Sequence, residues 1–378
     1  MDFDLTEEQR LLSDSVDRLL ADTYTFEKRK TYVTEPEGWS RALWSQYAEL
    51  GLLGLPFAEE YGGFGGGGIE TMLVMQAFGR VLALEPYLAS VVLSGTALRL
   101  AGNQALEAAL LPRMAEGKLV VAFAHGERQA RYDLSDVLTS AKRKGGGWVL
   151  DGAKSVVTHG GVAGKLIVSA RIKGDRNDPA GIALFLVDGN ANGVARRAYR
   201  LRDGMGAAEI ALAGVEVGGD ALLCDAGKAF PVIERVAEAG IAATAAEAVG
   251  AMETMQAMTL EYLKTRQQFG RAIGDNQALQ HRATEMFVAL EQGRSLAMLA
   301  AMMVDEPDAA ERQRNIAIVK AGVGQAARFV SQNAVQLHGG IGMTEEYAIG
   351  HYFRRVMVIE HSFGDTAHHL SRLAEQVA

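Results

Sequence analysis

Two segments of this chain have residue types and spacing suited to contacting an anionic ligand. The first is Arg266-Gln-Gln-Phe-Gly270, and the second, about seventy residues further on, is Gln336-Leu-His-Gly-Gly-Ile-Gly342. A guanidinium pairs with phosphate oxygens through a planar two-point fork. Glycine tolerates positive φ, so a Gly-Gly-x-Gly run lets the backbone approach a ligand closely. Each motif alone fits an ordinary turn between helices, so the interpretation depends on the pair and its order.

The elements that must position these motifs follow a three-part order. The pattern of residues 1–118 predicts helices. The first would begin after Thr6 as its N-cap, with Glu7 and Glu8 in its first turn. Residues 119–228 contain short apolar runs between Gly, Asp and Asn turns, which predict strands: Val120–Ala124, Trp148–Leu150, Lys165–Ala170, Ile182–Val187 and Glu209–Val217. Long helical stretches then return over Val232–Arg266, Ala278–Met303, Ala309–Gln336 and Tyr347–Val356.

This order and the two motifs resemble the acyl-CoA dehydrogenase family of flavoproteins. Ala58-Glu-Glu-Tyr-Gly-Gly63 is similar to the family's Pro-Glu-x-Tyr-Gly-Gly, and Asp151-Gly-x-Lys154 leading to Thr158-His-Gly-Gly161 is similar to its Gly-x-Lys-x-x-Ile-Thr-Asn-Gly. The resemblance implies an α+β fold with a helical N-terminal domain over 1–118, a small middle β domain over 119–228 and a C-terminal helical bundle over 229–378.

The resemblance also implies FAD as the cofactor. Arg266 and Gln268 would reach the pyrophosphate of a flavin held by a neighbouring subunit, with Phe269 near the adenosine. Thr158 would bond near flavin N5, although a hydroxyl in such a turn often caps its own backbone. The full set of implied cofactor contacts is Phe123, Thr158, Arg266, Gln268, Phe269, Gln336, Gly339, Gly340 and Thr366.

Three positions depart from the family pattern. Gly126 stands where a flavin-bonding Thr is usual, although Phe123 and Glu127 around it keep the pattern. Val156 stands where a Trp commonly covers the flavin. The Gly-Ser-Asp turn that usually contacts CoA is not recognisable, so the pattern for substrate contacts is incomplete on this side.

The catalytic base is also displaced. The reaction implied by the resemblance needs a shielded carboxylate over the substrate α-carbon. The family's C-terminal Glu corresponds to Phe363 or Gly364, and its alternative helix position corresponds to Gly240 or Ile241. Asp365 is the best-placed candidate, while a cap of the helix that begins at Ala367 explains it equally well. Other nearby carboxylates are Glu238, Glu247 and Glu360.

The leading hypothesis is an FAD-dependent acyl-CoA dehydrogenase that removes an α-proton and transfers a β-hydride to flavin N5, giving a 2,3-enoyl-CoA. An electron-transfer flavoprotein would accept the electrons, and the chain would form a homotetramer or a hetero-oligomer with a second dehydrogenase subunit. The displaced base keeps two alternatives open. One is a partly degenerate, FAD-cradling subunit, resembling the small subunit of a pimeloyl-CoA-type dehydrogenase. The other is a flavin oxidase or monooxygenase of the same fold that acts on a non-thioester substrate.

Composition excludes several classes of protein. A net charge of −8 argues against a nucleic-acid or membrane-surface binder. Cys224 is the single cysteine, so an internal disulfide is impossible and a reducing compartment is expected. The eight histidines show no metal-ligand spacing. Without a predicted signal peptide, transit peptide or membrane span, the expected location is cytoplasmic.

Overall fold

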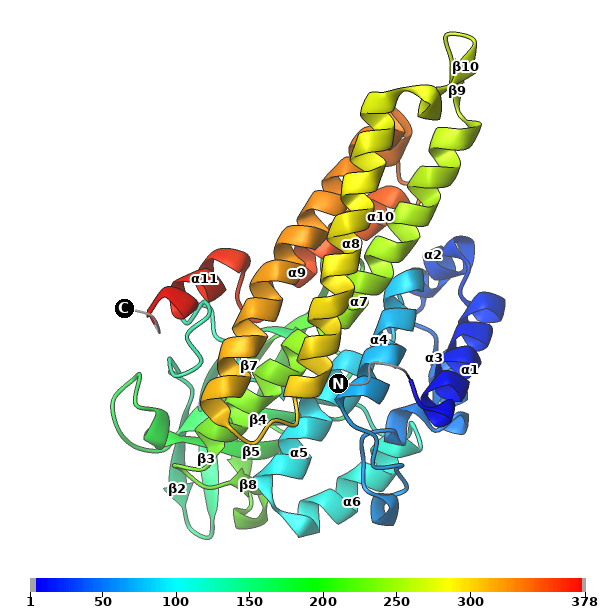
Figure 1. Ribbon diagram of the computed structural model, residues 1–378. Coiled ribbons are helices and arrows are strands. Elements are labelled where there is room, and N and C mark those ends of the chain that lie inside the picture. The colour runs from blue at the N-terminus through cyan, green and yellow to red at the C-terminus, as the bar shows by residue number, and fades with distance from the viewer. Residues whose placement is uncertain (1–4, 376–378) are drawn as a thin grey trace. The chain divides into compact units, whose positions relative to one another are not determined.

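The computed structural model of the protein describes residues 5–375 (Figure 1). Helices come first: α1 (Glu7–Thr23), α2 (Phe26–Thr34), α3 (Arg41–Glu49), η1 (Leu52–Gly54), η2 (Glu59–Tyr61), α4 (Gly68–Val81), the π-helix η3 (Leu88–Ser94), α5 (Gly95–Ala101) and α6 (Gln104–Ala115). Thr6 Oγ1 accepts the Gln9 N–H at 3.2 Å and Gln9 Oε1 accepts the Thr6 N–H at 3.0 Å, which confirms the predicted start of α1.

Strands follow, and then long helices. The strand region contains β1 (Val121–Ala124), β2 (Ser140–Lys144), β3 (Gly147–Thr158), β4 (Lys165–Arg171), η4 (Pro179–Gly181), β5 (Ile182–Asp188), β6 (Val194–Arg200), β7 (Gly206–Val217), η5 (Gly219–Ala221) and β8 (Leu222–Cys224). The last region contains α7 (Ala229–Thr265), β9 (Gln267–Gln268), β10 (Arg271–Ala272), η6 (Ile273–Asp275), α8 (Gln277–Met303), α9 (Ala309–His338), η7 (Gly339–Met343), α10 (Ile349–His361) and α11 (Thr366–Glu375). The predicted fold class is therefore confirmed.

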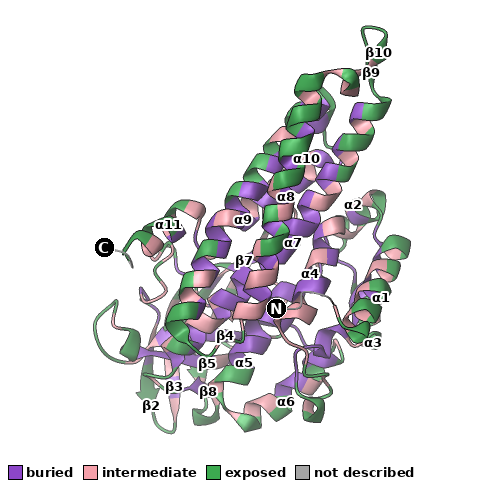
Figure 2. Cartoon of the chain, in the orientation of Figure 1, coloured by how far each residue is buried: buried purple, intermediate pink, exposed green. Residues whose placement is uncertain are grey.

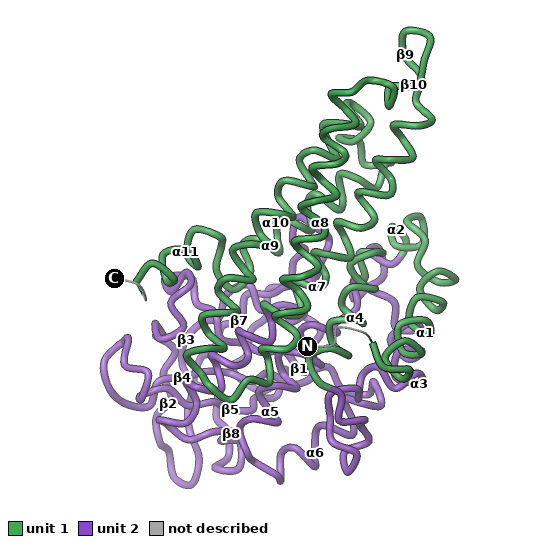
Figure 3. The backbone as a smooth tube through the Cα atoms, in the orientation of Figure 1, with its two compact units in different colours: residues 1–31, 67–83, 241–378 green, residues 32–66, 84–240 purple. Residues whose placement is uncertain are grey.

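The chain divides into two compact units, each made of stretches separated in sequence (Figure 3). The first contains the described residues of 1–31, 67–83 and 241–378, and the second contains 32–66 and 84–240. These units do not coincide with the predicted domains, which end at 118 and 228. The three-domain division therefore remains a proposal. Among the described residues, no helix has the length and apolar character needed to cross a membrane.

The first unit is built around α7 from Ile241 onward, with α8, α9 and α10. Their inward faces form one apolar cluster, shown as the buried stripes along these helices in Figure 2. Its members include Met252, Met255, Met286, Leu290, Val319, Val323, Val330, Ile349, Tyr352 and Val356. Asp308 starts α9 by accepting the Ala310 and Glu311 N–H groups at 2.9 and 3.0 Å. The bundle is therefore held by packing along the helices and by a capped start of α9.

The second unit contains the sheet, in the strand order β6-β7-β3-β2-β4-β5-β8, with β1 paired in parallel to β4. The five predicted apolar runs lie in β1, β3, β4, β5 and β7. Three strands were not predicted, namely β2, β6 and β8. β2 and β6 are rich in Lys and Arg and mostly exposed, and β8 is three residues long, so none has an apolar run.

Candidate functional site

The Arg266 motif forms the end of α7 and a tight hairpin. Phe269 and Gly270, with φ of 54° and 79°, connect β9 to β10, as in a two-residue type I′ turn. The Phe269 side chain is fully exposed, with a relative exposure of 102%. Arg266 is exposed too, and no hydrogen bond or ion pair joins its guanidinium to another described residue. The hairpin thus leaves a cation and an aromatic ring available to a ligand or another chain.

The Gln336 motif lies at the same end of the bundle. Tyr262 of α7 stacks on His338 of α9, with ring centroids 4.6 Å apart, so the two helix ends lie side by side (Figure 1). Gln336 is exposed, and Gly339 ends α9 with a φ of 64°. A Cβ on Gly339 or Gly340 would meet no described atom within 4 Å. The structure therefore brings the two motifs together at an open surface.

The expected base position lies in the turn between α10 and α11. Phe363 and Gly364 both have positive φ, 58° and 97°. Asp365 Oδ1 accepts the His368 N–H at 2.9 Å, so this carboxylate caps α11. That bond lowers the pKa of Asp365 despite partial burial. The side chain is half-buried, and the capping role considered from the sequence is present.

Asp365 and Thr366 lie away from the Arg266 and Gln336 motifs within this chain. Their turn is beside Gly324, near the middle of α9, because Thr366 Oγ1 lies 2.6 Å from where a Cβ on Gly324 would stand. Gln336 is twelve residues further along α9, which is about 18 Å at 1.5 Å per residue. One chain therefore does not assemble these two parts of the predicted site.

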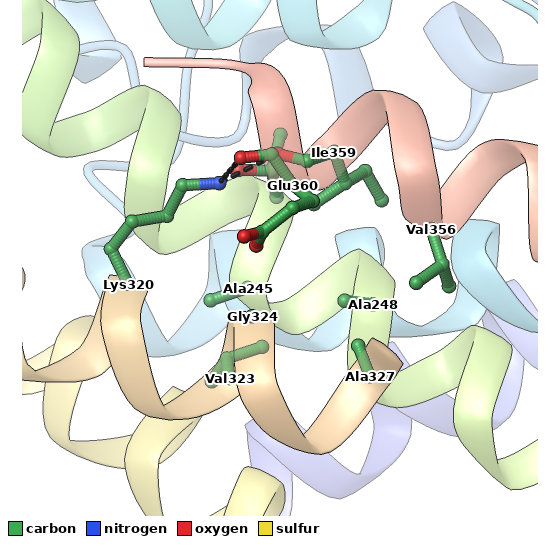
Figure 4. A pocket seen from close by; sticks show the side chains of 10 residues that line it. Ala245, Ala248, Lys320, Val323, Gly324, Ala327, Val356, Ile359 and Glu360 are labelled. Atoms are coloured by element: carbon green, nitrogen blue, oxygen red, sulfur yellow. Dashed lines mark hydrogen bonds between the residues drawn. The ribbon is translucent and has the colours of Figure 1, made fainter. Parts of the chain in front are cut away.

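A small pocket beside this turn is lined by Glu360, which was named from the sequence only as one of several carboxylates near the base position. The Glu360 side chain is only 2% exposed, and it faces small apolar residues of α7 and α9 (Figure 4). The pocket is lined by Thr244, Ala245, Ala248, Lys320, Val323, Gly324, Ala327, Val356, Ile359 and Glu360. These residues come from three helices, so no local sequence motif marks the pocket.

In the second unit, β3 bulges just before Thr158. Its pairing with β7 shifts register between Lys154 and Val157, and Val156 there has a φ of 52°. Positive φ is a genuine outlier for a β-branched residue. The bulge is supported by Glu209, which accepts the Ser155 hydroxyl at 2.9 Å and the Val156 N–H at 3.4 Å. Backbone strain of this kind collects at ligand sites.

The bulge leaves the Val156 side chain 54% exposed, at the position where the family has a flavin-covering Trp. Ser155 N–H also donates to the Gly126 carbonyl at 2.8 Å. The structure therefore places the two departures from the family pattern, Gly126 and Val156, next to each other. Thr158 follows two residues later, half-buried at the end of β3 and paired with Ala207.

A buried ion pair holds the loop after β1. Lys154 Nζ is completely buried and donates to Glu127 Oε1 at 2.7 Å and to Ser169 Oγ at 2.9 Å. Glu127 also accepts the backbone N–H groups of Leu138 and Thr139 at 2.8 and 3.0 Å. Burial lowers the pKa of Lys154 to about 8. Burial opposes ionisation of Glu127, but the charge and hydrogen bond of Lys154 outweigh it and lower the pKa of Glu127 to about 2.

This pair shapes the segment that follows Phe123. Phe123 lies on β1, opposite Ile167 of β4, and is half-buried with its ring stacked on His125 at 5.9 Å. Burial lowers the pKa of His125 to about 3, so this imidazole is neutral near pH 7. His125 Nδ1 lies 2.9 Å from Ser169 Oγ, the same hydroxyl that contacts Lys154. The polar groups of this segment are thus bonded to one another.

Comparison with known proteins identifies the family. Residues 6–118 match the acyl-CoA dehydrogenase N-terminal domain, residues 122–216 the middle domain and residues 228–378 the C-terminal domain. The chain belongs to the acyl-CoA dehydrogenase family. It is therefore an oxidoreductase of the CH–CH class whose family function is FAD-dependent oxidation of acyl-CoA.

Three relatives show how far the likeness extends. The probable acyl-CoA dehydrogenase YngJ of Bacillus subtilis is 27% identical over 383 residues, covering 99% of this chain and 98% of that protein. The ChsE4-ChsE5 complex from Mycobacterium tuberculosis contains a chain 26% identical, with a TM-score of 0.88, covering 100% of this chain and 99% of that one. A variant of the Tcur3481-Tcur3483 steroid ACAD is 28% identical, with a TM-score of 0.87 and 98% coverage of both chains.

The described residues of the first unit fit the dinucleotide part of FAD. The pyrophosphate of the cofactor needs a positive charge beside it. The Arg266 guanidinium can supply this charge, because it is exposed and has no partner among the described residues. The backbone at Gly339 and Gly340 is open to close approach. An anion could therefore bind at this end of the bundle without displacing an internal contact of either group.

Proposed function

We propose that this chain oxidises an acyl-CoA to the 2,3-enoyl-CoA with FAD shared between two chains. When bound, FAD supplies the two-electron oxidant that receives the β-hydride. The observation that carries the proposal is the exposed hairpin, where the Arg266 guanidinium has no partner within the described part of the chain. Arg266, Gln268, Phe269, Gln336, Gly339 and Gly340 would bind the dinucleotide of a flavin whose ring lies on a neighbouring chain. Phe123, Thr158 and Thr366 remain proposed contacts of the flavin.

Asp365 is the proposed proton acceptor. Its lowered pKa makes it a carboxylate at neutral pH, ready to accept the α-proton, although a low pKa also makes it a weak base. The strained Phe363–Gly364 turn supports this role, because it lies at the place in the chain where the family carries its base. Asp365 would act through the oxygen that the cap leaves available.

A second candidate function is a partly degenerate subunit of a hetero-oligomeric dehydrogenase, of the pimeloyl-CoA small-subunit type. Three observations favour it. No Glu occupies either family base position, and Asp365 is already bonded to the start of α11. Two similar structures, the ChsE4-ChsE5 complex and the Tcur3481-Tcur3483 protein, each carry the names of two proteins. In this case the chain would hold FAD while a partner chain supplies the base.

One experiment separates these functions. The chain is purified alone, its visible flavin absorbance is recorded, and a panel of acyl-CoAs is added without oxygen. Bleaching by a thioester supports the dehydrogenase, and adding an electron-transfer flavoprotein then tests the proposed acceptor. Bound flavin that bleaches only after a second dehydrogenase subunit is added supports the degenerate subunit. Flavin that no thioester reduces in either setting contradicts both and favours a non-thioester substrate.

A further inference from the structure

Glu360 ties the end of α10 to its neighbours through one carboxylate oxygen. Its Oε1 accepts a hydrogen bond from Arg328 Nη2 at 2.9 Å and another from the Thr366 N–H at 3.1 Å. Arg328 belongs to α9, and Thr366 is the first residue of α11. A single oxygen of Glu360 therefore links α9, α10 and the start of α11.

The other oxygen faces the pocket without a partner. Glu360 Oε2 and Thr366 Oγ1 are both buried and have no hydrogen bond to any described residue. They lie 2.2 and 2.6 Å from where a Cβ on Gly324 would stand. A cavity of about 10 Å³ adjoins Glu360 and Gly324, which is close to the room that one water molecule requires. Buried polar atoms without a protein partner are commonly bonded to such a water.

Lys320 fixes the same helix end through its backbone. Its ammonium donates to the carbonyl oxygens of Ile359 and Glu360 at 2.6 and 3.2 Å, as Figure 4 shows. These carbonyls lie in the last turn of α10, where a cation is favoured by the helix dipole. Burial lowers the pKa of Lys320 to about 8, so it is mostly charged at neutral pH. Lys320 therefore holds the backbone from which the Glu360 side chain extends.

The turn that these contacts support is strained. Phe363 is a bulky residue with a φ of 58°, and the His369 imidazole N–H donates to its carbonyl at 2.9 Å. Residues in such conformations persist only where their surroundings hold them. We propose that Glu360 is a positioning residue, which holds the Phe363–Thr366 turn through the Thr366 N–H and through one water bound between Glu360 Oε2 and Thr366 Oγ1. The expected loss of catalytic rate rests on the proposed function, whereas the expected loosening of the Phe363–Thr366 turn does not.

The first test compares Glu360→Ala with Glu360→Gln. The amide of Gln has the same shape, its oxygen can accept from Arg328 and Thr366, and its NH₂ can donate to Thr366 Oγ1. We expect Glu360→Ala to lower the kcat of flavin reduction by about tenfold or more, with KM within about threefold, because a misplaced catalytic group slows the step more than it weakens binding. We expect Glu360→Gln to stay within about threefold of the parent. Equal loss in both variants would make Glu360 the proton acceptor itself and overturn the positioning role.

The second test does not depend on turnover. Amide hydrogen exchange is measured at Thr366 and through the first turn of α11, on the flavin-loaded protein. In Glu360→Ala these amide hydrogens should exchange faster than in the parent, while in Glu360→Gln their exchange rates should match the parent. Unchanged exchange in Glu360→Ala overturns the proposal even if the parent is inactive with every thioester. A parent that does not bleach but shows the expected exchange contradicts the proposed function alone.

A third variant leaves Glu360 in place and fills the pocket. The Cβ of Gly324→Ala would stand within 2.6 Å of both unpartnered oxygens, so it should expel the water and displace the turn. Gly322→Ala is the matched control on the same helix, because its Cβ meets only the flexible end of Leu296. We expect Gly324→Ala to reproduce the kcat and exchange effects of Glu360→Ala, and Gly322→Ala to show neither. A folded Gly324→Ala with the kcat and amide exchange of the parent would overturn the water site. A crystal structure of the parent without water between these two oxygens would overturn it as well.

Discussion

At the residue scale, the Arg266 guanidinium is the clearest test of flavin binding. Arg266→Ala should weaken FAD binding tenfold or more, because a charge-assisted hydrogen bond contributes about 1.5–3 kcal/mol. Fluorescence titration of the apoprotein with FAD measures the change. Arg271→Ala is the matched control, since Arg271 lies in the same hairpin but bonds to Asn276 Oδ1 at 2.7 Å. Equal FAD affinity in the parent and Arg266→Ala would show that this motif is only a turn.

Asp365 can be tested separately as a base and as a cap. Asp365→Asn keeps a side-chain oxygen for the His368 N–H, so the free energy of unfolding should change little. Flavin reduction should fall by about 10²–10⁴, as is usual when a general base is removed. Asp365→Ala should in addition cost about 1 kcal/mol of stability through loss of the cap. Stopped-flow reduction at the parent rate in Asp365→Asn would leave only the capping role.

The sequence predicted residues of this site unevenly, for a physical reason. Arg266 and Gly339 lie in short contiguous motifs, whose turn chemistry is local and can be recognised along the chain. Glu360, Lys320 and Gly324 act together only because helices far apart in sequence pack against each other. Their individual types, an acid, a base and a glycine on helices, carry no local signal. The pocket therefore required the tertiary structure.

At the element scale, the Lys154–Glu127 pair joins β3 to the loop after β1. Lys154→Met leaves a buried carboxylate without its cation, which should lower the free energy of unfolding by about 3 kcal/mol. Glu127→Gln should lower the free energy of unfolding by less, because an amide oxygen can still accept the Leu138 or Thr139 N–H. Urea unfolding of the two variants gives the comparison. A smaller loss in Lys154→Met than in Glu127→Gln would contradict this account.

The same pair predicts an acid dependence of stability. The folded pKa of Glu127 is about 2, below its ordinary value of 4.5, so the unfolded chain binds more protons between these pH values. The contribution of Glu127 should be fully present above about pH 5 and be lost as the pH falls towards 2. Denaturant unfolding at several pH values measures the slope. Glu127→Gln should show a shallower acid loss than the parent, and an identical slope would assign the acid sensitivity to other groups.

Element types were predictable where at least one face of the element is buried. The strands β4 and β5 are apolar along their length, and α9 has its apolar residues at helical spacing. β6 reads Val-Ala-Arg-Arg-Ala-Tyr-Arg and is largely exposed, so its pairing with β7 leaves no apolar pattern in the sequence. The bulge in β3 was also unpredictable, because it depends on Glu209 of a strand about fifty residues away.

At the scale of the whole molecule, we expect an oligomer, and exposed apolar side chains of α8 and α9 offer a test. Phe287 and Val288 of α8 are 49% and 51% exposed, and Phe329 of α9 is 37% exposed. If these side chains form one apolar surface, another chain would cover it in an oligomer. We expect light scattering to give a multiple of the 40.5 kDa chain mass. The double variant Phe287→Glu, Phe329→Glu should shift this mass towards one chain and release FAD, if the cofactor is shared.

Leu11→Glu is the control for this last prediction, because Leu11 is 61% exposed on α1 and outside those two helices. It should keep both the parent mass and the bound flavin. Loss of FAD together with loss of mass in the double variant would link assembly to cofactor binding, as the proposed role of Arg266 and Phe269 predicts. A parent that has the mass of a single chain and still holds one FAD per chain would contradict the shared site, and Arg266 would then need a role within its own chain.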